Sequence, residues 1–140
     1  MEYPGKFRRF IAYIVDLLIV SVLITRPLNN LINKEFNLQS FFDYSFLSTV
    51  FLVNLLMGVL TVLYWSILEY KIGQTIGALL FSLRAKSENN KGLSFKQSLL
   101  RNITKINGLL IFIDAIGILF NKKRQRFFER ISKTVTIGVK

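Results

Sequence analysis

A lone acidic residue interrupts the first apolar segment of the chain. Residues 7–27 read FRRFIAYIVDLLIVSVLITRP, with Arg9 near the start and Asp16 near the middle. A carboxylate at membrane depth must face protein or water, and it can act as a fixed ion-pair partner or couple to protons or cations. Seven positions separate Arg9 from Asp16, so the two share a helical face but lie about 10.5 Å apart along the axis. Asp16 therefore needs another partner. The candidates in the sequence are Asn54, Arg101 and Asn107.

A second acidic residue, Asp114, lies in another apolar segment. Two membrane carboxylates that share a proton could activate water, as in aspartyl proteases. Neither YIVDLL nor FIDAIG resembles the motifs of such enzymes, so we expect no enzyme and interpret Asp114 as a charge partner or a helix break at the interface. The chain has no Cys and no His, which excludes disulfides, His-based acid–base catalysis, and zinc or haem ligation by those side chains. We expect no cofactor and no metal site.

Two apolar segments are predicted to cross the membrane. Residues 44–68 carry no charge and exceed the roughly 20 residues that a spanning helix needs. The first segment, about 8–26, reaches spanning length if Arg8 and Arg9 extend toward lipid headgroups. A signal peptide is the alternative for this N-terminus, but a signal core should lack a central Asp, and no small-residue cleavage site follows.

The distribution of charge predicts the orientation of these spans. The chain carries 19 Lys and Arg against 8 Asp and Glu, a net charge of +11. Residues 69–105 are basic and the 26–43 loop is neutral, so the positive-inside rule puts the N-terminus and residues 69–105 in the cytoplasm and the loop outside. We therefore expect a multi-pass protein of the cell membrane. This topology and contact with anionic lipids account for most of the excess positive charge. No recognisable nucleic-acid module accompanies the charge, so we expect no nucleic-acid partner.

The apolar tract at about 106–120 is shorter than either span. It contains Asp114 and has basic residues at both ends. A complete third crossing would leave the basic residues 122–126 outside, against the charge rule. We therefore favour a re-entrant or shallow helical segment with a cytoplasmic C-terminus over a tilted or shortened third span.

Amphipathic helices are expected on the cytoplasmic side. Apolar residues recur at helical spacing in residues 71–83, which predicts an interfacial helix in which Gly73 and Gly77 allow close helix packing. Ser94 is predicted to open a helix through a capping box and to lead into the 106–120 tract. The basic, Phe-containing residues 121–133 predict an interfacial helix on anionic headgroups.

One short β element completes the prediction. Residues 134–139 alternate apolar with polar or small side chains, as a strand does, and residues 81–86 could pair with them. The predicted fold class is an all-α integral membrane protein with one domain over residues 1–140. It has two long transmembrane helices, a third shorter membrane helix or re-entrant segment, amphipathic interfacial helices and a small two-stranded cytoplasmic β element.

Three motifs follow one another along the chain. Arg-x-x-Ala-x-x-x-Asp is formed by Arg9, Ala12 and Asp16. Gly-x-Thr-x-Gly, Leu-Arg and Ser-x-x-x-x-x-x-Arg-Asn are formed by Gly73, Thr75, Gly77, Leu83, Arg84, Ser94, Arg101 and Asn102. The closing motif is formed by Arg124, Gln125, Thr134 and Val135. In this order and over nearly the whole chain, the motifs resemble those of the RDD family of small prokaryotic membrane proteins, named for one arginine and two aspartates.

The resemblance implies that Arg9, Asp16 and the residue at position 129 form a charged motif. Glu129 stands where the family has its second aspartate, and its longer side chain suits an ion pair with an arginine better than a metal site. We favour a structural or accessory interaction module that forms a homo-oligomer or binds a membrane-protein partner. The alternative, which the family's membrane-embedded charges and proposed transport role suggest, is a cation or proton transporter with Asp16 as the coupling carboxylate. Two or three spans would need an oligomer to enclose its path.

Overall fold

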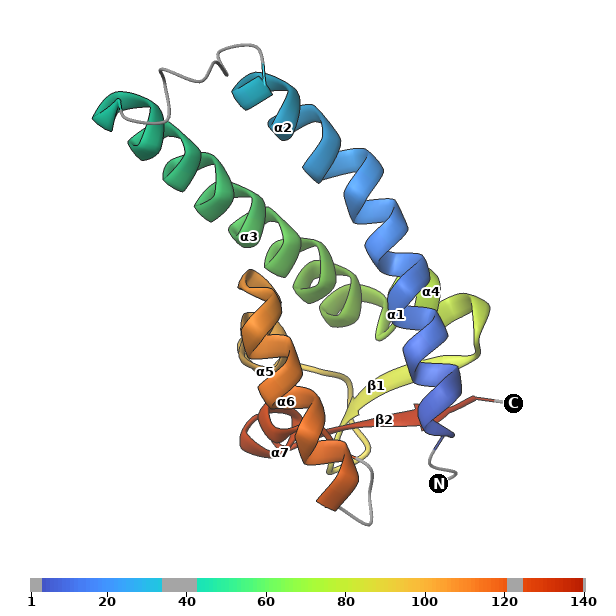
Figure 1. The fold of residues 1–140 in the computed structure, drawn as a ribbon. Coiled ribbons are helices and arrows are strands. Elements are labelled where there is room, and N and C mark those ends of the chain that lie inside the picture. Colours follow the sequence, from blue (N-terminus) through green and yellow to red (C-terminus); the bar gives the residue numbers. More distant parts are fainter. Residues whose placement is uncertain (1–3, 34–42, 121–124, 140) are drawn as a thin grey trace.

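A computed structural model describes residues 4–33, 43–120 and 125–139. Two long helices diverge from one end of the molecule, where short helices and two strands form a cap (Figure 1). The elements in chain order are α1 (Lys6–Val20), the π-helical turn η1 (Ser21–Thr25), α2 (Arg26–Asn33), α3 (Tyr44–Ile72), α4 (Ile76–Leu80), β1 (Leu83–Ser87), α5 (Phe95–Asn102), the 3₁₀ turn η3 (Ile103–Ile106), α6 (Gly108–Phe120), α7 (Phe127–Ile131) and β2 (Thr134–Gly138). Arg124, part of the closing motif, and the outer part of the 26–43 loop lie outside the described residues.

The first long helix extends further than the sequence predicted. α1 continues through η1 into α2, so the chain is helical from Lys6 to Asn33. Pro27 has no backbone N–H, and the helix widens before it, where the N–H of Arg26 donates to the carbonyl of Ser21 five residues back. The helix therefore continues beyond the span predicted at about 8–26, because proline near the start of α2 is compatible with a continuing helix.

The second long helix, α3, also continues beyond the span predicted at 44–68. The side chain of Asp43 caps its first turn, and Gly73 ends it with a left-handed backbone at φ 77°. The prediction of one amphipathic helix over residues 71–83 is therefore wrong. Ile72 still belongs to α3, and Thr75 caps the separate five-residue helix α4.

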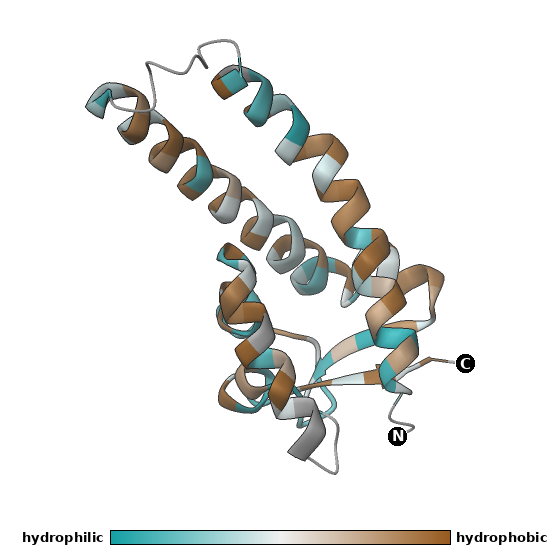
Figure 2. Cartoon of the chain, viewed as in Figure 1, coloured by the Kyte–Doolittle hydropathy of each residue, from teal (hydrophilic) through white to brown (hydrophobic). Residues whose placement is uncertain are grey.

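Both long helices could cross a bilayer. The segments Lys6–Asn30 and Tyr44–Ile72 are long and apolar enough to do so, and hydrophobic residues dominate their middle parts (Figure 2). Only 17 % of the most apolar part of the first helix and 11 % of that of the second is buried inside the molecule. Their apolar side chains therefore face outward, where a soluble protein would bear a large exposed apolar surface.

The predicted pair of strands is confirmed. β1 and β2 pair antiparallel, with Leu83 opposite Gly138 and Ser87 opposite Thr134. Leu83 and Ile137 are buried, so the sheet packs against the rest of the cap and is not an isolated hairpin in water.

The helix that begins at Ser94 is shorter than predicted. Ser94 and Gln97 form the expected capping box, but α5 ends at Asn102, and η3 with an extended Asn107 separates it from α6. The Asn107 side chain accepts a hydrogen bond from the N–H of Leu109 at 2.9 Å and so caps α6. The 13 residues of α6 rise about 20 Å, less than the roughly 30 Å hydrocarbon core of a bilayer.

The interior of the cap is polar. Among the described residues, buried polar and charged side chains outnumber buried apolar ones, and the largest fully buried side chains are those of Arg101 and Glu129. Such groups are costly to bury unless they are hydrogen-bonded or paired. Their partners therefore determine how the cap is held against the long helices.

Candidate functional site

Asp16 is bound by donors that come from α3 and from the start of α4. The residue is 2 % exposed. Its Oδ1 accepts hydrogen bonds from Tyr64 Oη at 3.1 Å and from the backbone N–H of Gly77 at 2.8 Å. Its Oδ2 accepts from Thr75 Oγ1 at 2.5 Å. Three neutral donors thus surround this carboxylate and tie α1 to the turn that follows α3.

Gly77 is required by the close approach of α4 to α1. A Cβ at this position would collide with the backbone carbonyl of Ala12 and come within 2.9 Å of the Asp16 carboxylate. The packing predicted for Gly73 and Gly77 is thus present at Gly77 only. Gly73 instead ends α3 with its positive φ.

Glu129, on α7, is the centre of a buried ion cluster. Its Oε1 lies 2.6 Å from Arg9 Nη2 and 2.9 Å from Arg101 Nη2, and it accepts from Thr136 Oγ1 at 2.9 Å. The backbone N–H of Arg126 donates to Oε2 at 3.0 Å. Arginines from the start of α1 and from α5 therefore converge on one carboxylate of the C-terminal segment.

The ionisation of Glu129 reflects these neighbours. Complete burial disfavours its charged form, but the guanidinium groups of Arg9, Arg126 and Arg101 outweigh burial and hold the pKa of Glu129 well below its ordinary value. The carboxylate is therefore charged at neutral pH and acts as an ion-pair partner.

A second cluster adjoins the first through Arg101. Arg101 Nε lies 3.1 Å from Glu69 Oε2, and Asn102 Nδ2 donates to the same oxygen at 2.6 Å. Lys105 Nζ donates to Asn102 Oδ1 at 2.6 Å and lies 4.2 Å from the centre of the Trp65 ring. These contacts join the end of α3 to α5 and η3.

Asp114 lies in a third group of contacts, which shares Arg126 with the Glu129 cluster. It is 1 % exposed; its Oδ1 accepts from the backbone N–H of Phe128 at 2.8 Å, and its Oδ2 accepts from Thr104 Oγ1 at 3.2 Å. Arg126 Nη1 lies 3.5 Å from Oδ2. Asp114 therefore joins α6 to α7 and to η3 from within an unbroken helix, and it does not mark the predicted helix break.

The partners that the sequence suggested for Asp16 bond elsewhere. Asn54 donates to the carbonyl of Val50, one turn earlier in α3, at 2.8 Å. Asn107 caps α6, and Arg101 binds Glu129 and Glu69. That expectation was wrong because it sought charged or amide partners, whereas a hydroxyl pair and a backbone N–H reach Asp16.

Sequence reasoning also missed several site residues. Glu69 directly follows the uncharged segment, and Lys105 is four positions after Arg101, a spacing that places two residues on one helical face. Those two signals could have identified Glu69 and Lys105 as site residues. Nothing in the local sequence singled out Arg126 or Thr136.

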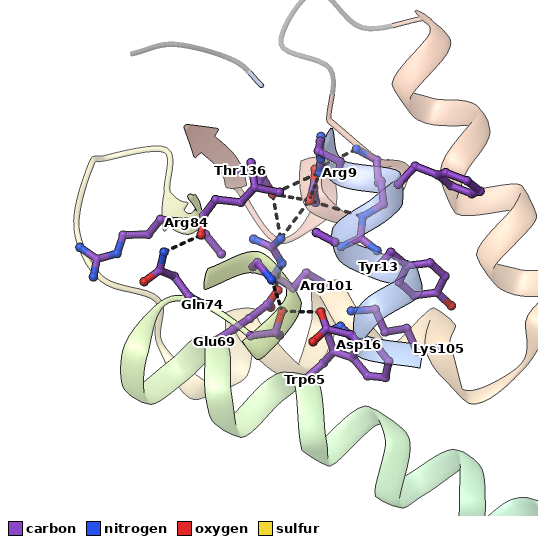
Figure 3. A pocket seen from close by; sticks show the side chains of 18 of the residues that line it. Arg9, Tyr13, Asp16, Trp65, Glu69, Gln74, Arg84, Arg101, Lys105 and Thr136 are labelled. Atoms are coloured by element: carbon purple, nitrogen blue, oxygen red, sulfur yellow. Dashed lines mark hydrogen bonds and ion pairs between the residues drawn. The ribbon is translucent and has the colours of Figure 1, made fainter. Parts of the chain in front are cut away.

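A cavity of about 610 Å³ lies among these groups, between α1, the end of α3, α5 and the sheet. Figure 3 shows Arg9, Asp16, Glu69, Arg101 and Lys105 around it. Across the described residues, no three acidic side chains gather so as to hold a metal ion.

The fold and the site define a small helical membrane protein with two candidate spans and a buried charge network at one end. The chain belongs to the RDD family, whose model matches residues 3–133, and the resemblance seen in the sequence is confirmed. It is 30 % identical over 141 residues to the uncharacterized protein YxaI of Bacillus subtilis (strain 168), a match that covers 89 % of this chain and 91 % of YxaI. No solved structure matches the chain significantly.

Proposed function

We propose that this protein is a structural or accessory module of the cell membrane whose charged motif braces the cap against two membrane-spanning helices. The observation that carries the proposal is the environment of Asp16, both of whose carboxylate oxygens accept from donors that the fold holds in place. A carboxylate that couples to transport must exchange protons or cations, and it needs room to change partners. The donors from Tyr64, Thr75 and Gly77 restrict such exchange.

Glu129 supports the same role. It binds Arg9 and Arg101 at short range while fully buried, an arrangement that fixes the relative positions of α1, α5 and α7. Removal of the carboxylate or of its arginine partners would leave the opposite charge buried and unpaired, so the cluster suits a permanent structural contact.

In this proposal both termini and the cap lie in the cytoplasm, and α6 stays at the inner face of the bilayer. The basic surplus of residues 69–105 supports this orientation. Leu23 and Phe51, 65 % and 67 % exposed, belong to lateral apolar surfaces that could bind a second copy or another membrane protein. The role requires no enzymatic chemistry, cofactor or nucleic acid.

The test combines ion flux with stability. Liposomes that contain the wild-type protein should show no Na⁺-dependent or K⁺-dependent proton flux above that of protein-free liposomes. Asp16→Asn should lower the thermal midpoint in detergent or change the oligomer distribution, because the new amide cannot accept from Thr75 through its nitrogen. Asp43→Asn is the matched control: it removes the same charge at an exposed helix cap, where Asn serves equally well.

The second candidate is a cation or proton transporter that acts as an oligomer. The observation that favours it is the position of Asp16 in the wall of the 610 Å³ cavity. Transport would require Asp16 to release one of its donors during the cycle. A cation-dependent proton flux that Asp16→Asn abolishes without loss of stability would establish this function and overturn the structural one.

A further inference from the structure

The cavity beneath the two long helices carries an excess of positive charge. Its basic lining residues are Lys6, Arg9, Arg84, Arg101, Lys105 and Arg126. Its acidic lining residues are Asp16, Glu69 and Glu129. Six basic groups thus face three acidic ones, and neutral donors already occupy one of the acids, Asp16. A surplus of this sign in the lining of a cavity favours an anionic ligand.

Arg101 has one terminal nitrogen, Nη1, for which the described residues supply neither a hydrogen-bond acceptor nor an ion pair. The residue is 2 % exposed, and its Nη2 donates to Glu129 and to Thr136. Among the described residues, its Nη1 and Nε have no hydrogen-bond acceptor, although Nε lies 3.1 Å from a Glu69 oxygen. A guanidinium has five donors in a fixed plane, and a buried charged donor without an acceptor is unfavourable. An acceptor in the cavity would remove this deficit.

Lys105 shows the same need for negative charge. Burial, and after it the positive charge of Arg126, hold the pKa of Lys105 well below its ordinary value. Lys105 lines the cavity together with Arg101 (Figure 3). An anion between them would stabilise the charged form of Lys105 and would accept a hydrogen bond from Arg101.

Exposed apolar side chains line part of the cavity. Phe7 and Phe10 line it and are 74 % and 59 % exposed, and they belong to the α1 segment that is apolar enough to enter a bilayer. Ile111 and Ala115 of α6 also line it. A free inorganic anion makes no favourable contact with these apolar side chains, whereas an amphiphile can place its acyl chains against them.

We propose that the cavity binds one anionic phospholipid, with the lipid phosphate on Nη1 of Arg101 and the acyl chains leaving along Phe7 and Phe10 into the bilayer. Nη1 carries two N–H groups, and hydrogen bonds from a guanidinium to phosphate oxygens are charge-assisted and strong. The volume of about 610 Å³ lies within the range of small-molecule sites. The lipid site rests on the proposed membrane location, but not on the proposed absence of ion flux.

The experiment is native mass spectrometry of the full-length protein in a neutral detergent. Dioleoyl phosphatidylglycerol is titrated against dioleoyl phosphatidylcholine, and we expect saturable retention of one phosphatidylglycerol molecule. Lys6→Gln, at an exposed basic residue that lines the cavity, should weaken this binding by about 10-fold, the loss of one charge-assisted contact. Arg8→Gln is the matched control, since Arg8 is also exposed and basic on the first turn of α1 but does not line the cavity.

Arg101→Lys tests the centre of the site. It keeps the charge and removes Nη1, so the folded variant, verified by circular dichroism, should lose most of the bound lipid. Equal retention of the two lipids, or equal effects of Lys6→Gln and Arg8→Gln, would overturn the proposal. Displacement of the lipid by millimolar glycerol 3-phosphate would overturn the need for acyl chains. Flux is measured separately in liposomes, so failure of the lipid site and failure of the proposed function are distinguishable.

Discussion

Arg9 and Glu129 are 120 positions apart in the sequence, yet Arg9 Nη2 lies 2.6 Å from Glu129 Oε1. This ion pair joins the start of the first long helix to the C-terminal segment. Arg101 and Thr136 bind the same Glu129 oxygen, so one carboxylate links α1, α5, α7 and β2. The position of the cap relative to α1 therefore depends on Glu129.

Glu129→Gln should destabilise the protein by about 3–5 kcal/mol, because it leaves buried guanidinium groups without their counter-charge. Glu129→Asp keeps the charge and restores the residue usual in the family, so its shorter reach should cost less, about 1–2 kcal/mol. Equilibrium unfolding of the detergent-solubilised protein, followed by the fluorescence of Trp65, the single Trp, measures both. Equal stability of the Gln variant and the wild type would contradict the central role of Glu129.

The stability of the protein should fall at acid pH through Glu129. Burial opposes its ionisation, but Arg9, Arg126 and Arg101 hold the folded-state pKa well below the ordinary 4.5. Between that folded pKa and 4.5 the unfolded chain binds a proton that the folded chain does not, so this stabilisation is full above about pH 5 and is lost as pH falls through the folded pKa.

The measurement is the free energy of unfolding of the wild type and of Glu129→Gln from pH 7 to pH 3. The difference between the two proteins should be constant down to about pH 5 and should shrink below it. A difference that stays constant to pH 3 would show that Glu129 is not the group responsible.

Gly77→Ala should destabilise the contact between α1 and α4. The added methyl would meet the Ala12 carbonyl and the Asp16 carboxylate, and overpacking of this kind costs about 1–3 kcal/mol. Gly92→Ala is the matched control, because a Cβ at Gly92 has nothing within 4 Å. Thermal midpoints in detergent compare the two, and equal midpoints would argue against close packing at Gly77.

The proposed orientation can be tested with single cysteines, because the chain has none of its own. Tyr44, 85 % exposed at the start of α3, is expected outside the cell, and Lys91, in the exposed turn after β1, inside. A membrane-impermeant maleimide added to intact cells should label Tyr44→Cys at once and Lys91→Cys only after permeabilisation. The opposite pattern would invert the proposed topology.

The features that could be predicted from the sequence are those that depend on residues close together in the chain. The apolar segment at 44–68, the capping box at Ser94 and the alternating strand residues each depend on a few consecutive positions, so pattern and propensity suffice. The helix boundaries were less predictable, because hydropathy does not mark them. The first helix widens before Pro27, α3 ends at Gly73, and the extended Asn107 separates η3 from α6.

The sequence by itself determined the supply of charges, the two apolar segments and the family motifs. Only the tertiary structure decided which groups meet. Asp16 lies beside Tyr64 and Thr75, and Arg101 binds Glu129 across 28 positions. Such pairings depend on how closely backbones approach, as α4 and α1 do at Gly77, and on competition among many donors for a few buried carboxylates. Neither is a property of any local stretch of chain, so the partners emerge only when the cap packs onto the long helices.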